Sequence, residues 1–131
     1  MSVTIGNLVR LLLDTQILIW MVSGDKKLTP AFLAALQNPD ATLHVSAVTA
    51  YEYADLQNRK RIPVDEPLAE LIDRFDLSIE PFPANCWQAA ALLPDIHRDP
   101  VDRMLIAHAL SAEMTLVTAD TLMRQYPVAL I

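Results

Sequence analysis

The chain has 131 residues, of which 53% are hydrophobic, and its formal net charge is −6. This length fits one domain, 1–131. Its two glycines are too few for a glycine-rich phosphate loop. Its single cysteine, Cys86, excludes an internal disulfide, which is typical of a protein in a reducing compartment. The negative charge disfavours a nucleic-acid partner, unless several carboxylates share one pocket with bound cations.

The first apolar stretch, residues 8–22, is interrupted by Arg10, Asp14 and Gln16. These polar residues divide it into pieces shorter than a membrane span, and an aspartate at its centre is unsuited to a signal peptide. We therefore expect a folded segment, a cytoplasmic protein and no membrane partner.

Apolar runs and helix-start signals alternate along the chain. Short apolar runs predict strands at 9–13, 43–46, 77–80, 114–118 and 128–131. Helices are predicted at 15–23, 30–37, 47–59, 85–93, 100–110 and 121–125, together with one that Asp65 caps and that contains 68–75. Gly24 is expected to end the first helix and Thr29 to cap the second. Strands that alternate with helices indicate an α/β sandwich around a mostly parallel sheet.

The most distinctive stretch is 97–110. Asp99 suits the N-cap of a helix, because its carboxylate can accept a hydrogen bond from an unpaired backbone N–H. Asp102 falls in the first turn, and apolar side chains follow it three, four and seven residues later. The Asp102 carboxylate is therefore aimed at the buried side of the helix, where it needs a partner.

Three further acids are expected near Asp102. Asp14 and Asp120 each follow a predicted strand, and ligands of an open parallel sheet lie beyond the carboxyl ends of its strands. Glu52 lies in the helix after the second predicted strand. Unit charges about 4 Å apart repel by about 4 kcal/mol at an effective dielectric of 20, so such a cluster needs protons or cations. Oxygen ligands favour Mg²⁺ or Mn²⁺, which indicates metal-dependent hydrolysis of a phosphodiester.

Each of these residues also has a plainer interpretation. Asp14, Asp99 and Asp120 suit helix caps, and Glu52 suits a solvated helix position. Two threonines, Thr15 and Thr118, are candidates to bond the carboxylates or metal-bound water, although threonine is also common at strand ends. The remaining expectations concern packing: His97 at the surface, and His108, Trp20 and Trp87 in the interior.

Basic residues form two groups, Arg59-Lys60-Arg61 and Arg98 with Arg103. One interpretation is that they contact the phosphate backbone of a nucleic acid near the acidic pocket. The alternative is that they are solvated helix ends or ion pairs.

Four segments resemble the PIN domain family and, within it, the VapC toxins of toxin–antitoxin pairs. They are Leu11–Thr15 (LLLDT), Ser46–Glu52 (SAVTAYE), His97–Ala107 (HRDPVDRMLIA) and Thr115–Asp120 (TLVTAD). The third segment is the most specific. Together, their order and spacing span nearly the whole chain.

This resemblance implies a five-stranded parallel sheet with helices on both faces and a Mg²⁺- or Mn²⁺-dependent endoribonuclease that cuts single-stranded RNA. It implies that Asp14, Glu52, Asp102 and Asp120 bind the metal, with Asp99 as a companion. It also implies homodimers and a cognate antitoxin protein that silences the toxin.

The chain departs from the family pattern at Gln16, where His is frequent, at Tyr51, where Trp is frequent, and at Leu56, where Lys is frequent. No metal-binding acid is lost. Two alternatives stay open: a catalytically inactive PIN fold that acts only in protein interaction, and cleavage of structured DNA.

Overall fold

Four parallel strands form one sheet at the centre of the molecule, which is described here for residues 8–131 in a computed structural model. The strands are β1 (Val9–Leu13), β2 (Ala41–Ser46), β3 (Leu77–Glu80) and β4 (Thr115–Val117), arranged in the order β3-β2-β1-β4. Leu11 of β1 pairs with Leu43 of β2 on one side and with Thr115 of β4 on the other. The first strand is therefore central, and its carboxyl end lies beside that of β4.

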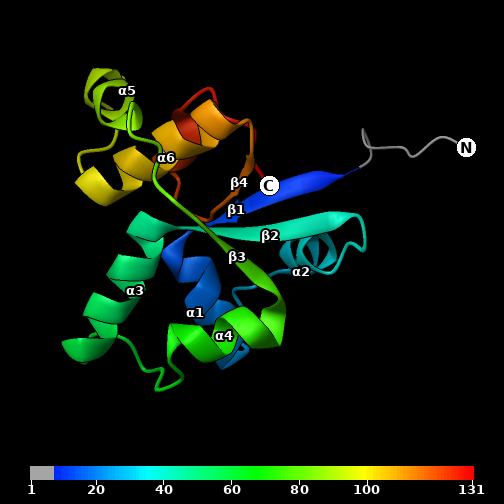
Figure 1. The fold of residues 1–131 in the computed structure, drawn as a ribbon. Coiled ribbons are helices and arrows are strands. Elements are labelled where there is room, and N and C mark those ends of the chain that lie inside the picture. The colour runs from blue at the N-terminus through cyan, green and yellow to red at the C-terminus, as the bar shows by residue number, and fades with distance from the viewer. Residues whose placement is uncertain (1–7) are drawn as a thin grey trace, which may run out of the picture.

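Within residues 8–131, six α-helices surround this sheet (Figure 1). They are α1 (Thr15–Ser23), α2 (Pro30–Leu36), α3 (Ala47–Asn58), α4 (Leu68–Phe75), α5 (Cys86–Leu92) and α6 (Pro100–Ala112), and a short 3-10 turn follows at Met123–Gln125. In Figure 1, α5 and α6 lie above the sheet and α1, α3 and α4 lie below it. The predicted α/β architecture with helices on both faces is confirmed.

The alternation of side chains along β1 explains the two layers. Leu11 and Leu13 pack in a core with α1 and α4, whereas Leu12 packs in a second core with Leu105 and Ile106 of α6. All three leucines of the strand are fully buried. A parallel strand buried on both faces is necessarily an apolar run rather than an alternating one.

Local capping chemistry sets several helix ends. The Asp14 carboxylate accepts a hydrogen bond from the Ile17 N–H at 2.8 Å, and Asp99 accepts from Val101 and Asp102 in the same way. Helix α1 ends at Gly24, whose φ of 64° lies in the left-handed region that glycine tolerates. These predicted caps are confirmed.

Three predicted elements differ. The helix predicted at 121–125 is only a short 3-10 turn at Met123–Gln125, because Tyr126, which precedes Pro127, is extended and ends the turn. The strand at 128–131 is reduced to a single bridge between Leu116 and Leu130, because only the backbone groups of Leu116 bond to this segment, at Ala129 and Ile131. The sheet therefore has four strands rather than five. The helix expected to start after Asp65 begins at Leu68, since a residue before proline, here Glu66 before Pro67, is driven out of the helical conformation.

Helix α5 corrects one packing expectation. Its small residues Cys86 and Ala90 pack against Ala107 of α6. Trp87, one position further round the helix, is 67% exposed rather than interior. Among residues 8–131, no helix combines the length and apolar character needed to cross a membrane.

Candidate metal centre

A cleft of about 580 Å³ opens at the carboxyl ends of β1 and β4, and the four predicted acids line it together. Asp14 follows β1, Glu52 lies in the middle of α3, Asp102 lies in the first turn of α6, and Asp120 follows β4. Because β1 and β4 are adjacent and parallel, the residues that follow them meet at one edge of the sheet. The predicted convergence of the four acids on one cleft is therefore found in the structure.

Asp14 is the most deeply placed of these acids, with 7% of its surface exposed. One carboxylate oxygen accepts from the Ile17 N–H, and the other accepts from the Thr118 hydroxyl. Burial raises the pKa of Asp14 to about 6, with smaller contributions from repulsion by Asp120 and Glu52, while these hydrogen bonds oppose the rise. Both of its hydrogen-bond partners are neutral, so ionised Asp14 has no cationic side chain bonded to it.

Glu52 is fixed by a threonine in the same manner. The Thr15 hydroxyl, at the start of α1, donates a hydrogen bond to Glu52 Oε1 in α3. The neighbouring acid, Asp55, instead pairs with Arg59 at 2.9 Å. The threonines at positions 15 and 118 therefore each hold one carboxylate, as one of the two sequence interpretations expected.

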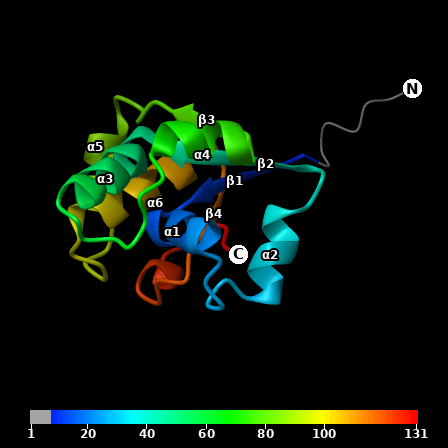
Figure 2. The same cartoon turned by 90° about the horizontal axis from the view of Figure 1, so that it is seen from below.

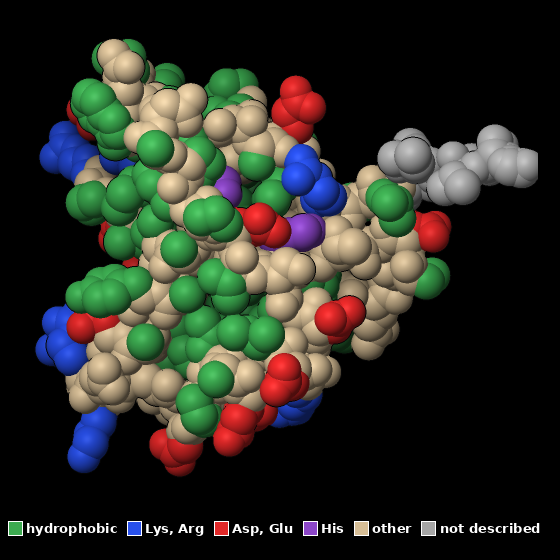
Figure 3. Space-filling view, in the orientation of Figure 1, with side chains coloured by type: hydrophobic (Ala, Val, Ile, Leu, Met, Phe, Trp, Pro, Cys, Tyr) green, Lys and Arg blue, Asp and Glu red, His purple; other side chains and the backbone are tan. Residues whose placement is uncertain are grey.

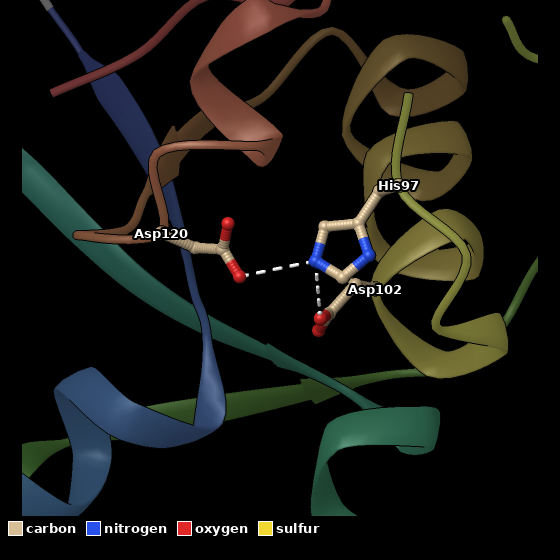
Figure 4. A group of neighbouring side chains, drawn as sticks. All are labelled: His97, Asp102 and Asp120. Carbon is tan, nitrogen blue, oxygen red and sulfur yellow. Dashed lines mark hydrogen bonds and ion pairs between the residues drawn. The ribbon is translucent and has the colours of Figure 1, made fainter. Parts of the chain in front are cut away.

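His97 joins the remaining two acids (Figure 4). Its Nε2 lies 2.9 Å from Asp102 Oδ2 and 3.0 Å from Asp120 Oδ2. The Asp99 N–H donates to His97 Nδ1 at 3.1 Å, so in the neutral ring the proton is on Nε2, which donates to Asp120 Oδ2 and also lies beside Asp102 Oδ2. The expectation of a surface histidine is wrong: His97 is 8% exposed, because its backbone N–H is held by the buried Tyr126 hydroxyl.

The surroundings of Asp102 and Asp120 shift the pKa values of these two carboxyls in opposite directions. Burial, followed by repulsion from Asp99, raises the pKa of Asp102 to about 7, even though His97 opposes the rise. For Asp120, burial also acts upward, but hydrogen bonds from His97 and from the Met123 and Leu122 N–H groups hold its pKa below the usual value. Carboxyls with such divided acidities in one cleft are typical of a functional site.

A divalent cation fits this set of donors. One ligand atom from each of His97, Asp102 and Asp120 lies within 4.8 Å of the others, and Asp14 and Glu52 line the same cleft. The buried Asp14 carboxyl is bonded only to neutral donors, so a nearby cation would relieve the cost of its charge. Because His97 presents an N–H in this tautomer, the carboxylate oxygens would be the ligands of a bound cation, and oxygen ligands suit Mg²⁺ or Mn²⁺.

The predicted basic residues have different surroundings. Arg103 donates to the carbonyls of 90, 91, 93, 94 and 97, so it ties the segment before α6 to that helix. Arg59 pairs with Asp55, Lys60 lines a separate cleft, and Arg98 is exposed. Arg61 alone of the five lines the acidic cleft.

Three residues of this site could not be recognised as functional from sequence patterns. His97 meets Asp120 across 23 positions, and no local spacing announces that contact. Lys27 and Trp20 also line the cleft, although lysine after a turn and tryptophan in an apolar helix carry no functional signal by themselves.

Fold and site together define a class of protein: the chain belongs to the PIN domain family, whose model matches residues 11–129. This confirms the resemblance found in the sequence. Among individual relatives, Ribonuclease VapC22 of Mycobacterium tuberculosis is 27% identical over 118 residues, which are 88% of this chain and 90% of that protein.

Two solved structures are similar in fold. VapBC2 from Rickettsia felis, solved bound to a promoter DNA fragment, has a TM-score of 0.69 at 19% identity, with 94% of this chain and 98% of that chain covered. VapC20 of M. tuberculosis, a toxin that cleaves the sarcin-ricin loop, has a TM-score of 0.67 at 16% identity, with 91% and 96% covered. At these identities the likeness concerns the fold.

Proposed function

We propose that this protein is a Mg²⁺- or Mn²⁺-dependent endoribonuclease that cuts single-stranded RNA and acts as the toxin of a VapBC-type toxin–antitoxin pair. The observation that carries the proposal is the gathering of Asp14, Glu52, Asp102 and Asp120, from four separate elements, in one cleft. Membership of the PIN family and the ribonuclease name of the VapC22 relative support it.

In this proposal the four carboxylates hold the cation, and each of the supporting side chains has a positioning role. When bound, the cation would lower the pKa of a coordinated water and neutralise charge on the phosphate. Thr118 fixes the carboxylate of Asp14, and Thr15 fixes that of Glu52. His97 keeps Asp102 and Asp120 together, so that acids from α6 and from the segment after β4 face one site.

The proposal includes a cognate antitoxin, a homodimer and a cytoplasmic location. The similar fold from R. felis is a VapBC assembly, and another, from Klebsiella pneumoniae, is a toxin–antitoxin complex. Large apolar side chains lie exposed on α5, where Trp87 is 67% and Leu92 is 77% exposed, and Figure 3 shows hydrophobic side chains gathered over this helix. Exposed apolar clusters of this kind favour contact with another protein.

The decisive experiment measures cleavage of a labelled single-stranded RNA in Mg²⁺, with EDTA and a single-stranded DNA of the same sequence as parallel arms. We expect RNA cleavage that EDTA stops and that Asp14→Asn and Glu52→Gln abolish. Asp55→Asn is the matched control, because Asp55 lies on the same helix as Glu52 but pairs with Arg59 instead.

Each alternative has its own outcome. A folded protein that binds an antitoxin but cleaves no nucleic acid in Mg²⁺ or Mn²⁺ would be a protein-interaction module. Preferential cleavage of a branched or hairpin DNA would identify a structure-selective deoxyribonuclease.

A further inference from the structure

The lining of the acidic cleft is not made of carboxylates alone. The apolar side chains of Trp20 of α1, Leu56 of α3 and Ile62 line it, together with two cations, Lys27 and Arg61. Among the residues that the structure describes, the four acids already named are the acidic part of this lining. One cleft therefore combines four carboxylates with two cations and an apolar wall.

The two cations have no partner inside the described part of the chain. Within residues 8–131 neither the Lys27 ammonium nor the Arg61 guanidinium forms an ion pair, although four carboxylates line the same cleft. By contrast, Arg74 pairs with Glu66 at 2.6 Å, and Arg103 is bonded to backbone carbonyls. Unpaired cations that share a cleft with acids are suited to an anion from outside the chain.

The backbone positions of both cations are fixed. Lys60 adopts a left-handed conformation with φ of 54°, which turns the chain back so that the Arg61 N–H donates to the Leu56 carbonyl at 2.8 Å. Lys27 lies in a turn, where its backbone N–H donates to Asp25 Oδ1 at 2.9 Å. Their side chains are exposed, so a ligand has to order these side chains but not the backbone that carries them.

Trp20 lies on the same helix that Asp14 caps. It is five residues beyond Thr15, or about 7.5 Å further along the axis at 1.5 Å per residue. The indole is half-buried against the core and also lines the cleft. A rigid aromatic ring beside a cationic groove is the recurrent platform for a base of single-stranded nucleic acid. Figure 2 shows α1, the helix that carries Trp20, between α3 and the C-terminal turn.

We propose that these cationic and apolar side chains bind a nucleotide of single-stranded RNA next to the phosphate that is cut, with Lys27 and Arg61 on its phosphates and Trp20 stacked on its base. The inference rests on the proposed function. Nucleic acid is favoured over a protein tail because it brings phosphate oxygens for the cations and for metal ions held by the acids.

The test measures binding of a fluorescein-labelled 12-nucleotide RNA of random sequence by fluorescence anisotropy in Mg²⁺. It uses the full chain carrying Asp102→Asn, so that hydrolysis does not deplete the probe. We expect Trp20→Leu to weaken binding about 5- to 100-fold and Trp20→Phe to retain most of the affinity. Lys27→Ala and Arg61→Ala should each reduce the slope of log affinity against log salt by about 0.7.

Matched controls come from the chain itself. Lys26→Ala changes an exposed lysine outside the lining of the cleft, and Trp87→Leu changes an exposed tryptophan on α5. Both should bind the RNA probe as the parent does. Without Asp102→Asn, every variant should keep the shift in melting temperature that Mn²⁺ produces, which shows that fold and metal centre are intact.

The inference is overturned if the Trp20, Lys27 and Arg61 variants bind RNA like their controls, or if Trp20→Phe is as weak as Trp20→Leu. It is equally overturned if these variants lose affinity for the antitoxin but not for RNA. Failure of the wild-type chain to cleave any RNA in Mg²⁺ would instead refute the proposed function, so the two failures are distinguishable.

Discussion

Substitution of Asp102 by Asn should stabilise the metal-free protein, although it removes a residue of the proposed site. The folded state raises the pKa of Asp102 from 3.8 to about 7, so its contribution to stability is complete below 3.8 and is lost as the pH rises through 7. Asn cannot ionise, and its side-chain oxygen can still lie against His97 Nε2, as the Asp102 carboxylate does. The substitution therefore removes the cost of a buried charge and keeps a polar contact.

The magnitude follows from the size of the shift. At about 1.36 kcal/mol per unit, a rise from 3.8 to about 7 corresponds to at most about 4 kcal/mol. The side chain is 24% exposed, so solvent screening reduces this figure, and we expect about 2–4 kcal/mol at pH 8. The advantage of Asp102→Asn should be small near pH 4, grow up to about pH 7 and then level off.

The assay is urea unfolding in EDTA, followed by far-ultraviolet circular dichroism at several values of pH between 4.5 and 8.5. Asp73→Asn, on the exposed surface of α4, is the control and should show no such growth with pH. A difference between Asp102→Asn and wild type that stays constant with pH, or a variant less stable than wild type at pH 8, would refute the reasoning.

Three further predictions concern the same region. Mn²⁺ at 100 times its dissociation constant should stabilise the wild-type chain by about 2.7 kcal/mol in thermal unfolding, and Asp14→Asn should reduce this gain. Thr118→Val should destabilise the protein by about 1–3 kcal/mol in urea unfolding, because it leaves one oxygen of buried Asp14 without its hydrogen-bond donor. The same substitution should weaken Mn²⁺ binding in titration calorimetry. Arg103→Gln should lower stability by about 2–3 kcal/mol without changing the salt dependence of RNA binding, since its guanidinium is bonded to carbonyls; a reduced salt slope would mark it as a phosphate contact instead.

Most of the fold could be predicted because its signals are local. The run of leucines in β1 is buried on both faces, and Asp14, Thr29 and Asp99 cap helices where the sequence indicates. Convergence of Asp14 and Asp120 follows from a general property of parallel sheets, which needs only the strand ends to be found.

The features that escaped prediction depend on contacts between distant segments. His97 is buried because Tyr126, 29 positions away, holds its backbone, and Trp87 is exposed because Cys86 and Ala90 supply the contact with α6. Arg103 is the clearest case: an arginine near an acidic cleft suggests a phosphate contact, but the carbonyls of the preceding loop take up its donors.

The caps have a consequence for comparing PIN sequences. Asp14 and Asp120 each use a carboxylate oxygen to bind backbone N–H groups at a helix or turn, so a lineage that had lost nuclease activity would still be selected to keep them for folding. Glu52, in the interior of α3, caps nothing. Under the proposed function, replacement of Glu52 is therefore a better indicator than replacement of Asp14 or Asp120 that a PIN chain has lost nuclease activity.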